Sequence, residues 1–349
     1  MKIAQIAPLA EAVPPRLYGG TERIVSYLTE QLVRHGHEVT LFASGDSRTA
    51  AALVSGWPRA LRLDPAVRDS VPYMLMTLDE VRRRADEFDV LHFHIDLLHF
   101  PLFRDVAERT VTTLHGRLDL PDLPPFYAKF AEFPLVSISD DQRRPLPRAN
   151  WCATVHHGLP VDLLEPSRRA GGYLAFLGRV SPEKRPDLAI EIAQRAGLPI
   201  RLSAKIDAVD RDYFEARIKP LLRLPGVEFI GEIGEAQKSE FLGNAAALLF
   251  PIDWPEPFGL VMIEAMACGT PVIAFRRGSV PEVLEDGVTG YVVDGVEEAV
   301  SAIDRLDRLD RAAIRRRFEQ RFSAARMMRD YVTLYESLAS VPAKGRRVA

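Results

Sequence analysis

The chain has 349 residues, enough for two domains of ordinary size. Its composition, 47% hydrophobic and 27% charged, is that of a globular protein, and no apolar run approaches the roughly 18 residues of a membrane-spanning helix. With 45 Lys and Arg against 48 Asp and Glu, the net charge of −3 gives no global attraction to nucleic acid, so we expect no nucleic-acid partner.

Short apolar runs alternate with amphipathic helical segments in the first half, a pattern typical of parallel α/β units. The run at 2–7 predicts the first strand, and a loop through Gly19 and Gly20 leads into a helix that ends at Gly36. Further strands are predicted at 38–43, 90–94, 110–114, 135–139 and 153–156. All are short enough to be buried strands of one open sheet.

A polar segment with Pro and Gly at 158–172 interrupts the alternation and predicts an interdomain linker. After it, strands are predicted at 173–178, 200–204, 227–230, 248–250 and 271–274, and helices at 186–195, 213–222, 237–244 and 259–268. We expect helices to fill the remainder, ending at 324–338, and the tail at 343–349 to be disordered. The predicted α/β fold is two doubly wound parallel-sheet domains facing across a cleft, with ligands beyond the carboxyl ends of the strands.

The loop at 18–22 (YGGTE) follows the first predicted strand. Two glycines before a helix let a ligand approach the backbone closely, and a helix start favours an anion. The alternative is a flexible turn with Thr21 as the N-cap. The chain has no G-x-G-x-x-G after this strand and no P-loop, which removes most support for a dinucleotide or ATP phosphate loop.

The loop at 178–184 (GRVSPEK) follows the first strand of the second half and carries Arg179 and Lys184. Arginine offers a planar fork of donors and lysine a compact charge, a suitable pair for two adjacent phosphates. The alternative is a solvated surface loop. Its position opposite an acidic turn favours phosphate binding.

His115 lies at the end of a predicted strand in the first half, followed by Gly116. It is therefore a candidate for a role in the cleft, with a structural histidine as the alternative. His92, His94 and His99 lie nearby in the sequence, but no acidic cluster matches them, so we expect no metal site.

The stretch at 248–274 is the most informative in the chain. A buried strand opens into a loop that holds Glu256, and a helix beginning near Phe258 and Gly259 carries Glu264 eight residues later. The helical rise puts both acids on about the same side, two turns apart. A carboxylate accepts two hydroxyl hydrogen bonds at once and suits a vicinal diol, whereas it suits a diphosphate badly. We therefore expect the acids to bind sugars and the basic residues to bind phosphate, as in a nucleotide-diphosphate-sugar site.

Other catalytic signatures are missing from the sequence, including a Ser-His-Asp or Cys-His nucleophile and a persuasive metal-binding D-x-D. Asp140, Asp141, Asp207 and Asp210 are interpreted as loop and capping acids.

The segment from Glu256 to Glu264 (EPFGLVMIE) resembles the E-x7-E motif of glycosyltransferase family 4. The stretches AMACGTPVIA and 278–290 are similar to the C-terminal half of that family, 178–184 to its phosphate-binding loop and 19–22 to its N-terminal glycine loop. The resemblance covers nearly the whole chain and implies the GT-B fold, two Rossmann-like domains with the active site between them. It also implies sugar transfer from a nucleotide-diphosphate donor with retention at the anomeric carbon, with no metal and no cofactor.

By position, the resemblance assigns roles in a donor-binding domain at 161–323. Arg179 and Lys184 would hold the donor diphosphate, and Glu264 would take the ribose hydroxyls. Glu256 would bind the donor sugar and β-phosphate together with the backbone of Phe258, Gly259 and Leu260. A front-face route is implied, in which the departing phosphate oxygen accepts the acceptor's proton and the basic residues stabilise developing negative charge.

The resemblance likewise implies an acceptor-binding domain at 1–160, with the helix at 324–340 packing back on it. Gly19 and Gly20 would approach the phosphates, and His115 would contact the donor sugar. The residues expected to take part in catalysis are Glu256, His115, Arg179 and Lys184.

The sequence departs from the family after the strand at 200–204, where many members carry a Gly-Asp-Gly turn and this chain reads LSAKIDAVDRDYF. Lys205 is interpreted as a phosphate or base contact, or as a solvated side chain. Ile206 and Ile233 are candidates for the nucleobase pocket. Because the base is read here, UDP, GDP and ADP donors are not distinguished.

Two alternatives to a glycosyltransferase remain. One is an epimerase or phosphorylase with the same GT-B fold, and the other is a protein that binds a nucleotide sugar without catalysing a reaction. A glycan, a lipid-linked molecule or a small molecule would be the acceptor. Arginines at 82–84, with Arg143, Arg144 and Arg148, could contact an anionic membrane peripherally. The N-terminus does not resemble a signal peptide, and Cys152 and Cys268 are expected to be buried and unpaired. We therefore expect a cytoplasmic protein, with membrane association as the open alternative.

Overall fold

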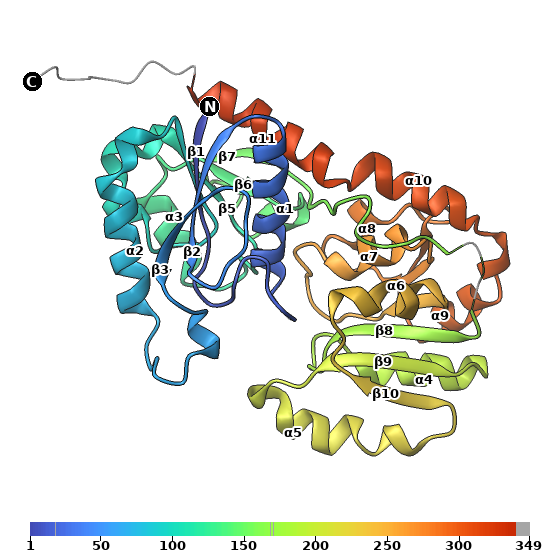
Figure 1. Cartoon of the computed structure of the whole chain (residues 1–349). Helices are drawn as coiled ribbons and strands as arrows, with labels where there is room; N and C mark the ends of the chain where they lie inside the picture. The colour runs from blue at the N-terminus through green and yellow to red at the C-terminus, as the bar shows by residue number, and fades with distance from the viewer. Residues whose placement is uncertain (18, 168, 170, 340–349) are drawn as a thin grey trace, which may run out of the picture. The chain divides into compact units, whose positions relative to one another are not determined.

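In the computed structural model, the described residues are 1–17, 19–167, 169 and 171–339. They divide into two compact units, the first comprising Met1–Gly158 with the last helix and the second comprising Leu159–Ser323. Each unit is an open parallel sheet with its own helices (Figure 1). The predicted disordered tail at 343–349 lies outside the described residues.

The first unit contains a seven-stranded sheet in the order β3-β2-β1-β4-β5-β6-β7. Every neighbouring pair is parallel. The strands are β1 (Lys2–Ile6), β2 (Glu38–Ser44), β3 (Ala52–Trp57), β4 (Val90–Phe93), β5 (Thr110–Thr113), β6 (Leu135–Ser137) and β7 (Trp151–Thr154). The direction of strand addition reverses between β1 and β4, the switch point at which doubly wound sheets bind ligands.

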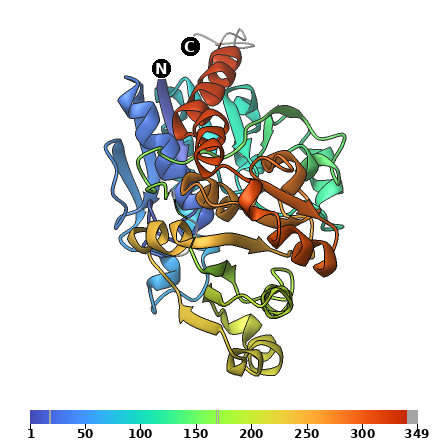
Figure 2. The same ribbon diagram turned by 90° about the vertical axis from the view of Figure 1, so that its right-hand side faces the viewer.

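The helices of the first unit are α1 (Gly20–Arg34), α2 (Val71–Arg83), α3 (Leu123–Lys129) and α11 (Ala324–Ala339). Although α11 is the last helix in the chain, it packs beside α1, and the two run side by side in both views (Figures 1 and 2). Tyr331 and Tyr335 of α11 are almost completely buried. The end of the chain therefore completes the core of its beginning.

Three elements of the first unit were not predicted: β3, α2 and α3. All six residues of the edge strand β3 are exposed or half-buried, so the strand has no buried apolar face and gives little signal. Helix α2 leaves Val71, Leu75 and Met76 exposed, which blurs its apolar stripe.

The second unit contains a six-stranded parallel sheet in the order β10-β9-β8-β11-β12-β13. The strands are β8 (Tyr173–Arg179), β9 (Ile200–Lys205), β10 (Val227–Gly231), β11 (Ala245–Phe250), β12 (Val272–Phe275) and β13 (Gly290–Val293). Here the switch point lies between β8 and β11.

The second unit carries its helices in chain order between and after these strands. They are α4 (Pro186–Ala196), α5 (Arg211–Tyr213), α6 (Glu235–Gly243), α7 (Leu260–Ala267), α8 (Val280–Val283), α9 (Val296–Ile303) and α10 (Arg311–Arg321). Helices α4 and α9 pack together, and α7 packs with α6 and α10. The segment predicted as a helix at 213–222 continues α5 through a π-helical turn, Phe214–Ile218, and a short 3-10 turn, Leu221–Arg223.

Two predictions about the second unit were wrong. Helices do not fill the remainder, because β13 is a four-residue strand whose buried side chains are too few to show a period. The linker is shorter than 158–172: the Leu159 N–H donates to the Phe322 carbonyl at 2.8 Å, and Arg315 donates to the Leu164 carbonyl at 2.9 Å. This segment is thus packed against the second unit.

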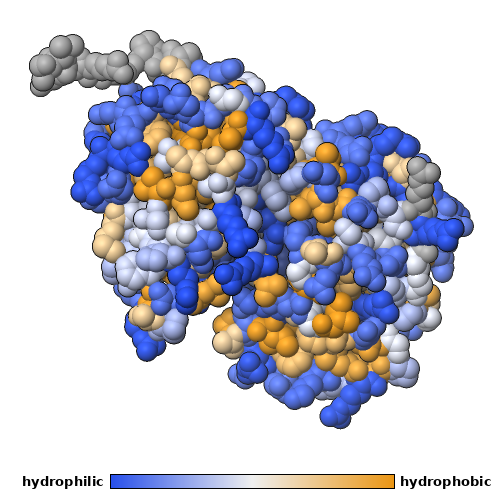
Figure 3. Space-filling model, viewed as in Figure 1, coloured by the Kyte–Doolittle hydropathy of each residue, from blue (hydrophilic) through white to orange (hydrophobic). Residues whose placement is uncertain are grey.

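On the face drawn in Figure 3, hydrophilic residues are mixed with apolar patches on each unit. No helix among the described residues is long and apolar enough to cross a membrane. Cys268 is buried as expected, but Cys152 is exposed because it lies on the edge strand β7. Both cysteines are free.

Candidate functional site

The switch point of the second unit brings Lys184 and Glu256 together. Their loops leave the neighbouring strands β8 and β11, and the Asp253 N–H donates to the Glu183 carbonyl at 2.9 Å, which ties one loop to the other. The Lys184 ammonium donates to Glu256, and the Trp254 indole N–H donates to the same carboxylate at 2.9 Å. The ammonium also lies 5.2 Å from the Trp254 ring centre. An acid expected to bind sugar and a base expected to bind phosphate are therefore direct partners.

The turn around Glu256 is held in place by Gly278 and Ser279, the two residues that precede α8. The Ser279 N–H donates to the Glu256 carbonyl at 3.0 Å, and its hydroxyl donates to the Phe258 carbonyl at 2.9 Å. Gly278 has a φ of 53°, and a Cβ there would lie 2.3 Å from the Glu256 nitrogen. Only glycine allows this approach.

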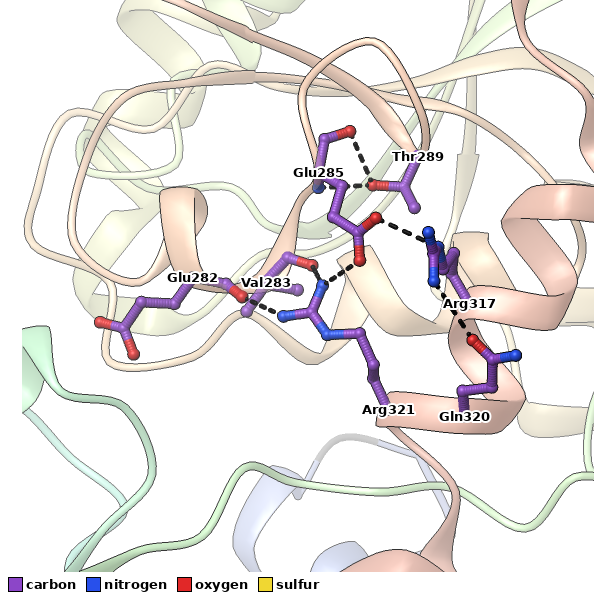
Figure 4. Close-up of polar contacts among 7 residues, drawn as sticks. All are labelled: Glu282, Val283, Glu285, Thr289, Arg317, Gln320 and Arg321. Carbon is purple, nitrogen blue, oxygen red and sulfur yellow. Dashed lines mark hydrogen bonds and ion pairs between the residues drawn. The ribbon is translucent and has the colours of Figure 1, made fainter.

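Two arginines of α10, Arg317 and Arg321, hold α8 and the residues that follow it (Figure 4). Arg321 donates to the Glu282 carbonyl at 2.6 Å and to the Glu285 carboxylate at 3.0 Å. Arg317 lies 3.1 Å from the other oxygen of that carboxylate. The Thr289 hydroxyl accepts the Glu285 N–H at 2.8 Å. The Glu256 turn is therefore connected to α10 through α8.

Arg179, at the end of β8, faces acids. Its guanidinium lies 3.2 Å from Asp210, 3.8 Å from Glu183 and 4.0 Å from Asp207. Burial raises the pKa of Asp210, and the charge of Arg179 opposes that rise. Neither aspartate caps a helix through its side chain, which corrects their interpretation as capping acids.

Glu264 lies inside α7, where the Lys238 ammonium of α6 donates to it at 2.7 Å. Only 6% of the Glu264 side chain and 11% of the Lys238 side chain are exposed. Burial and the neighbouring Glu264 charge raise the pKa of Cys268 to about 12, so this thiol is not a nucleophile. The argument that helical spacing places Glu256 and Glu264 on one side was wrong, because α7 begins only at Leu260.

The remaining predicted donor residues of this unit surround the same edge of the sheet. Phe258 is buried, and Gly259 directly precedes α7, an end that no described side chain caps. Lys205 is the cross-strand partner of Arg179, and its ammonium lies 2.8 Å from Asp207. Ile233 is buried and Ile206 is half-buried.

In the first unit, Gly19 precedes α1 with a φ of 151°, and α1 begins at Gly20. No side chain caps this end among the described residues, so Thr21 is not the N-cap. Glu22 is only 5% exposed, and burial raises the pKa of its carboxyl. Tyr18, also part of the predicted loop, lies outside the described residues.

His115 follows β5 in a buried network rather than standing alone. His94 Nδ1 lies 2.9 Å from His115 Nε2, and His94 Nε2 lies 2.9 Å from Gln5 Oε1. The His157 ring stacks on His115 with centroids 5.3 Å apart. Burial lowers the pKa of His115 to about 3, so the ring is neutral.

Sequence reasoning missed the partners that fix these side chains. Lys238 and Arg321 are distant in sequence from the acids they contact, and no local pattern marks them. Ser279 lies in the family-like stretch 278–290, but its hydrogen bonds to the backbone of the Glu256 turn were not predicted. The predicted basic patch is largely neutralised: Arg82 pairs with Asp105, and Arg84 donates to Glu87 at 2.8 Å. No group of three His, Cys, Asp or Glu suited to a metal occurs in the part of the chain that the structure describes.

Two family models match the chain. The model for glycosyl transferases group 1 matches residues 167–321, and the model for glycosyltransferase family 4 matches residues 18–159. Each unit is therefore matched over most of its length by one of the two models.

Curated relatives agree with these models. The D-inositol 3-phosphate glycosyltransferase of Streptomyces griseus is 30% identical over 56% of this chain, which spans 40% of that relative's length. The phosphatidyl-myo-inositol mannosyltransferase of Mycobacterium tuberculosis is 26% identical over 98% of this chain and 99% of its own.

Solved structures share the fold. AviGT4, a glycosyltransferase involved in avilamycin A biosynthesis, has a TM-score of 0.70 at 24% identity, with 98% of both chains covered. Anabaena Alr3699/HepE, solved with UDP and glucose, has a TM-score of 0.74 at 19% identity, covering 97% of this chain and 100% of its own. The fold is GT-B. From these matches and the E-x7-E segment, the chain belongs to glycosyltransferase family 4.

Proposed function

We propose that this glycosyltransferase moves a sugar from a nucleoside-diphosphate donor to a hydroxyl of its acceptor. The observation that supports this most is the set of four charged residues around the β8–β11 switch point: Arg179, Lys184, Glu256 and Glu264. The uncapped start of α7 adds backbone N–H groups suited to a phosphate. Arg179 and Lys184 would exchange their carboxylate partners for the diphosphate, and Glu256 would then be free to accept sugar hydroxyls.

We propose retention of the anomeric configuration by a front-face route. The phosphate leaves, an oxocarbenium-like centre forms, and the acceptor hydroxyl attacks from the same side and gives its proton to the departing phosphate oxygen. In this route Arg179 and Lys184 stabilise the negative charge that develops on the leaving diphosphate. The reaction then needs no metal, and turnover should be unchanged by EDTA.

We propose a polyol as the acceptor. Two of the relatives are named for transfer to D-inositol 3-phosphate and to phosphatidyl-myo-inositol, both of which carry a cyclic polyol and a phosphate. Offering myo-inositol, inositol 3-phosphate and phosphatidylinositol side by side separates the polyol from its phosphate and its lipid.

A thermal-shift panel of UDP-glucose, GDP-mannose and ADP-glucose tests the donor class. We expect one nucleotide sugar to raise the unfolding temperature at concentrations well above its Kd. At a hundredfold excess over Kd, the free energy of unfolding should increase by about 2.7 kcal/mol. If none stabilises the protein and no donor hydrolysis is measurable, the proposed function is wrong. Stabilisation without turnover of any acceptor would instead favour a nucleotide-sugar binder.

Two variants test the residue assignments. Glu264→Ala should weaken nucleotide binding, and Arg179→Ala should lower turnover with any acceptor. Arg316→Ala is the control, since this arginine of α10 pairs only with the exposed Asp310 in a contact of 3.3 Å. Wild-type binding and rates in both test variants would remove these two residues from the site.

A further inference from the structure

Gln5 of β1 connects three buried histidines of the first unit. It is fully buried, as is His92, and His94 is 2% exposed. The two histidines lie on the neighbouring strand β4 or directly after it, and Gln5 is the register partner of His92. The two ends of the Gln5 amide contact two different chains of hydrogen bonds.

The oxygen end determines the protonation of His94 and His115. An amide oxygen has no proton, so His94 Nε2, 2.9 Å from Gln5 Oε1, must donate. His94 is neutral because burial lowers its pKa well below the ordinary value, so its Nδ1 carries a lone pair. His115 Nε2, 2.9 Å from that lone pair, must then be the donor. The remaining nitrogen of His115, Nδ1, is consequently an acceptor.

The nitrogen atom of the Gln5 amide determines the protonation of His92, and it also places the His92 proton on Nε2. Gln5 Nε2 donates to the Tyr335 hydroxyl at 3.1 Å, and that hydroxyl donates to His92 Nδ1 at 2.6 Å. His92 Nε2 therefore carries the proton and donates to the Thr113 hydroxyl at 2.7 Å. The opposite amide orientation would reverse every donor in both chains. The orientation of one amide thus fixes the tautomers of three imidazoles.

His115 Nδ1 is the open end of this network. The atom is buried, and it has no hydrogen-bond partner among the described residues. His115 comes directly after β5, at the edge of the sheet where parallel α/β domains bind ligands. A buried acceptor without a partner is costly unless a ligand supplies the donor.

We propose that Gln5 is a positioning residue that fixes His115 in the Nε2–H tautomer, so that Nδ1 accepts a hydrogen bond from a hydroxyl of the bound sugar. This inference rests on the proposed function for the identity of the ligand. A hydroxyl can supply the proton, whereas a carboxylate or phosphate oxygen cannot. The network therefore selects a neutral polyol group at this point.

Imidazole ¹⁵N NMR of the full chain tests the tautomers without any ligand. We expect His92, His94 and His115 to be protonated at Nε2 only. In Gln5→Met, His115 should show a mixture of tautomers, while His99, which bonds Thr112 outside this network at 2.9 Å, keeps its signals. A proton on Nδ1 of His115 in the wild-type protein would overturn the assignment.

Deoxy analogues of the donor test the ligand. Among UDP-glucose, GDP-mannose and ADP-glucose, the one that is turned over is compared with its monodeoxy sugars. One position should lose roughly tenfold in kcat/KM with the wild-type protein, as for one neutral hydrogen bond, and lose little in His115→Ala. In Gln5→Met, removing that hydroxyl should lower kcat/KM by a smaller factor than in the wild type. The KM of the unmodified donor should change by less than this factor.

The two measurements separate the two failures. Equal deoxy penalties in the wild type and Gln5→Met would overturn the role of Gln5 even if the NMR tautomers are as expected. If none of the three nucleotide sugars is bound or turned over, the proposed function and the sugar contact fail together, and the NMR result still decides the tautomer assignment.

Discussion

At the scale of single residues, each acid of the E-x7-E segment is held by a lysine from another element. Lys184 serves Glu256 from the β8 loop, and Lys238 serves Glu264 from α6. The second pair is the more deeply buried, at 11% and 6% exposed. A buried carboxylate that loses its partner retains the full cost of desolvation. Lys238 therefore holds the Glu264 carboxylate in place for its proposed ligand.

Lys238→Met should reveal this dependence. We expect the variant to lose about 3 kcal/mol or more of stability, because Glu264 would remain buried without a positive partner. Replacing both residues in Lys238→Met/Glu264→Leu should recover much of the loss, since no buried charge is then left. Urea midpoints of the single and double variants measure the difference.

The control for this prediction is Lys219→Met. Lys219 also pairs with a glutamate, Glu215, but the two side chains are 54% and 47% exposed. Exposed pairs contribute about 0–1 kcal/mol, so the midpoint should hardly move. Equal losses in Lys238→Met and Lys219→Met would contradict the burial argument.

At the scale of elements, α8 depends on its neighbours, because a helix of four residues has too few internal hydrogen bonds to persist alone. Arg321 and Arg317 of α10 hold its end (Figure 4). The contacts of Ser279 hold its start. Because α8 contacts both α10 and the Glu256 turn, we expect a shift of α10 to move the turn. Substitutions in α10 should therefore change donor binding.

Arg321→Ala should raise the KM for the donor several-fold while the far-ultraviolet circular dichroism spectrum keeps its helical content. The variant removes charge-assisted hydrogen bonds worth about 1.5–3 kcal/mol each and frees the end of α8. Arg316→Ala on the same helix should leave the KM unchanged, because its partner Asp310 is remote from α8. A KM for Arg321→Ala equal to that of Arg316→Ala would show that α8 does not position the turn.

The glycines of this region provide a second matched pair. Gly278 and Gly287 both have positive φ, 53° and 73°, but a Cβ at Gly278 would lie 2.3 Å from the Glu256 nitrogen, whereas nothing lies within 4 Å at Gly287. Both alanine variants should lose about 1 kcal/mol of stability from the backbone conformation. Gly278→Ala should additionally lose at least tenfold in kcat/KM, measured by donor turnover, and similar activities would rule out the steric argument.

Which parts of the site were predictable follows from these contacts. The loops at 178–184 and 256–264 were recognisable because their function requires particular residues close together in sequence. Glu256 and Lys184 were both identified, yet their direct pairing was not, since it depends on β8 lying beside β11. Asp210 was interpreted as a loop or capping acid because its three-dimensional partner, Arg179, lies at the end of β8, distant in sequence.

The same limit applied to the elements. The buried strands β1, β4 and β12 are mostly apolar and were predicted, whereas the exposed edge strand β3 and the edge strand β13 were not. A strand is recognisable from sequence when its own burial creates the pattern. At an edge, the neighbouring strand supplies the stability and the pattern fades.

At the scale of the whole molecule, the two units share a strand order but differ in what they bury. The first contains four buried histidines and the half-buried His115, and desolvation lowers the pKa of all five: His92, His94, His99, His115 and His157. In the unfolded chain each would titrate near pH 6.5. Between that pH and the lower folded pKa values, the unfolded state binds more protons than the folded state. Stability is therefore complete above about pH 6.5 and falls as the pH drops below it.

Acid sensitivity should consequently begin in the first unit, as the pH falls below about 6.5. Each buried histidine can remove up to about 1.4 kcal/mol per pH unit in this window. His99→Gln removes one of them without touching the Gln5 network, because His99 Nε2 bonds the Thr112 hydroxyl, which is not part of that network. Its free energy of unfolding should depend less steeply on pH between 6.5 and 4.5, measured by urea unfolding at a series of pH values. Identical slopes for the wild type and His99→Gln would mean that His99 does not remain neutral in the folded protein.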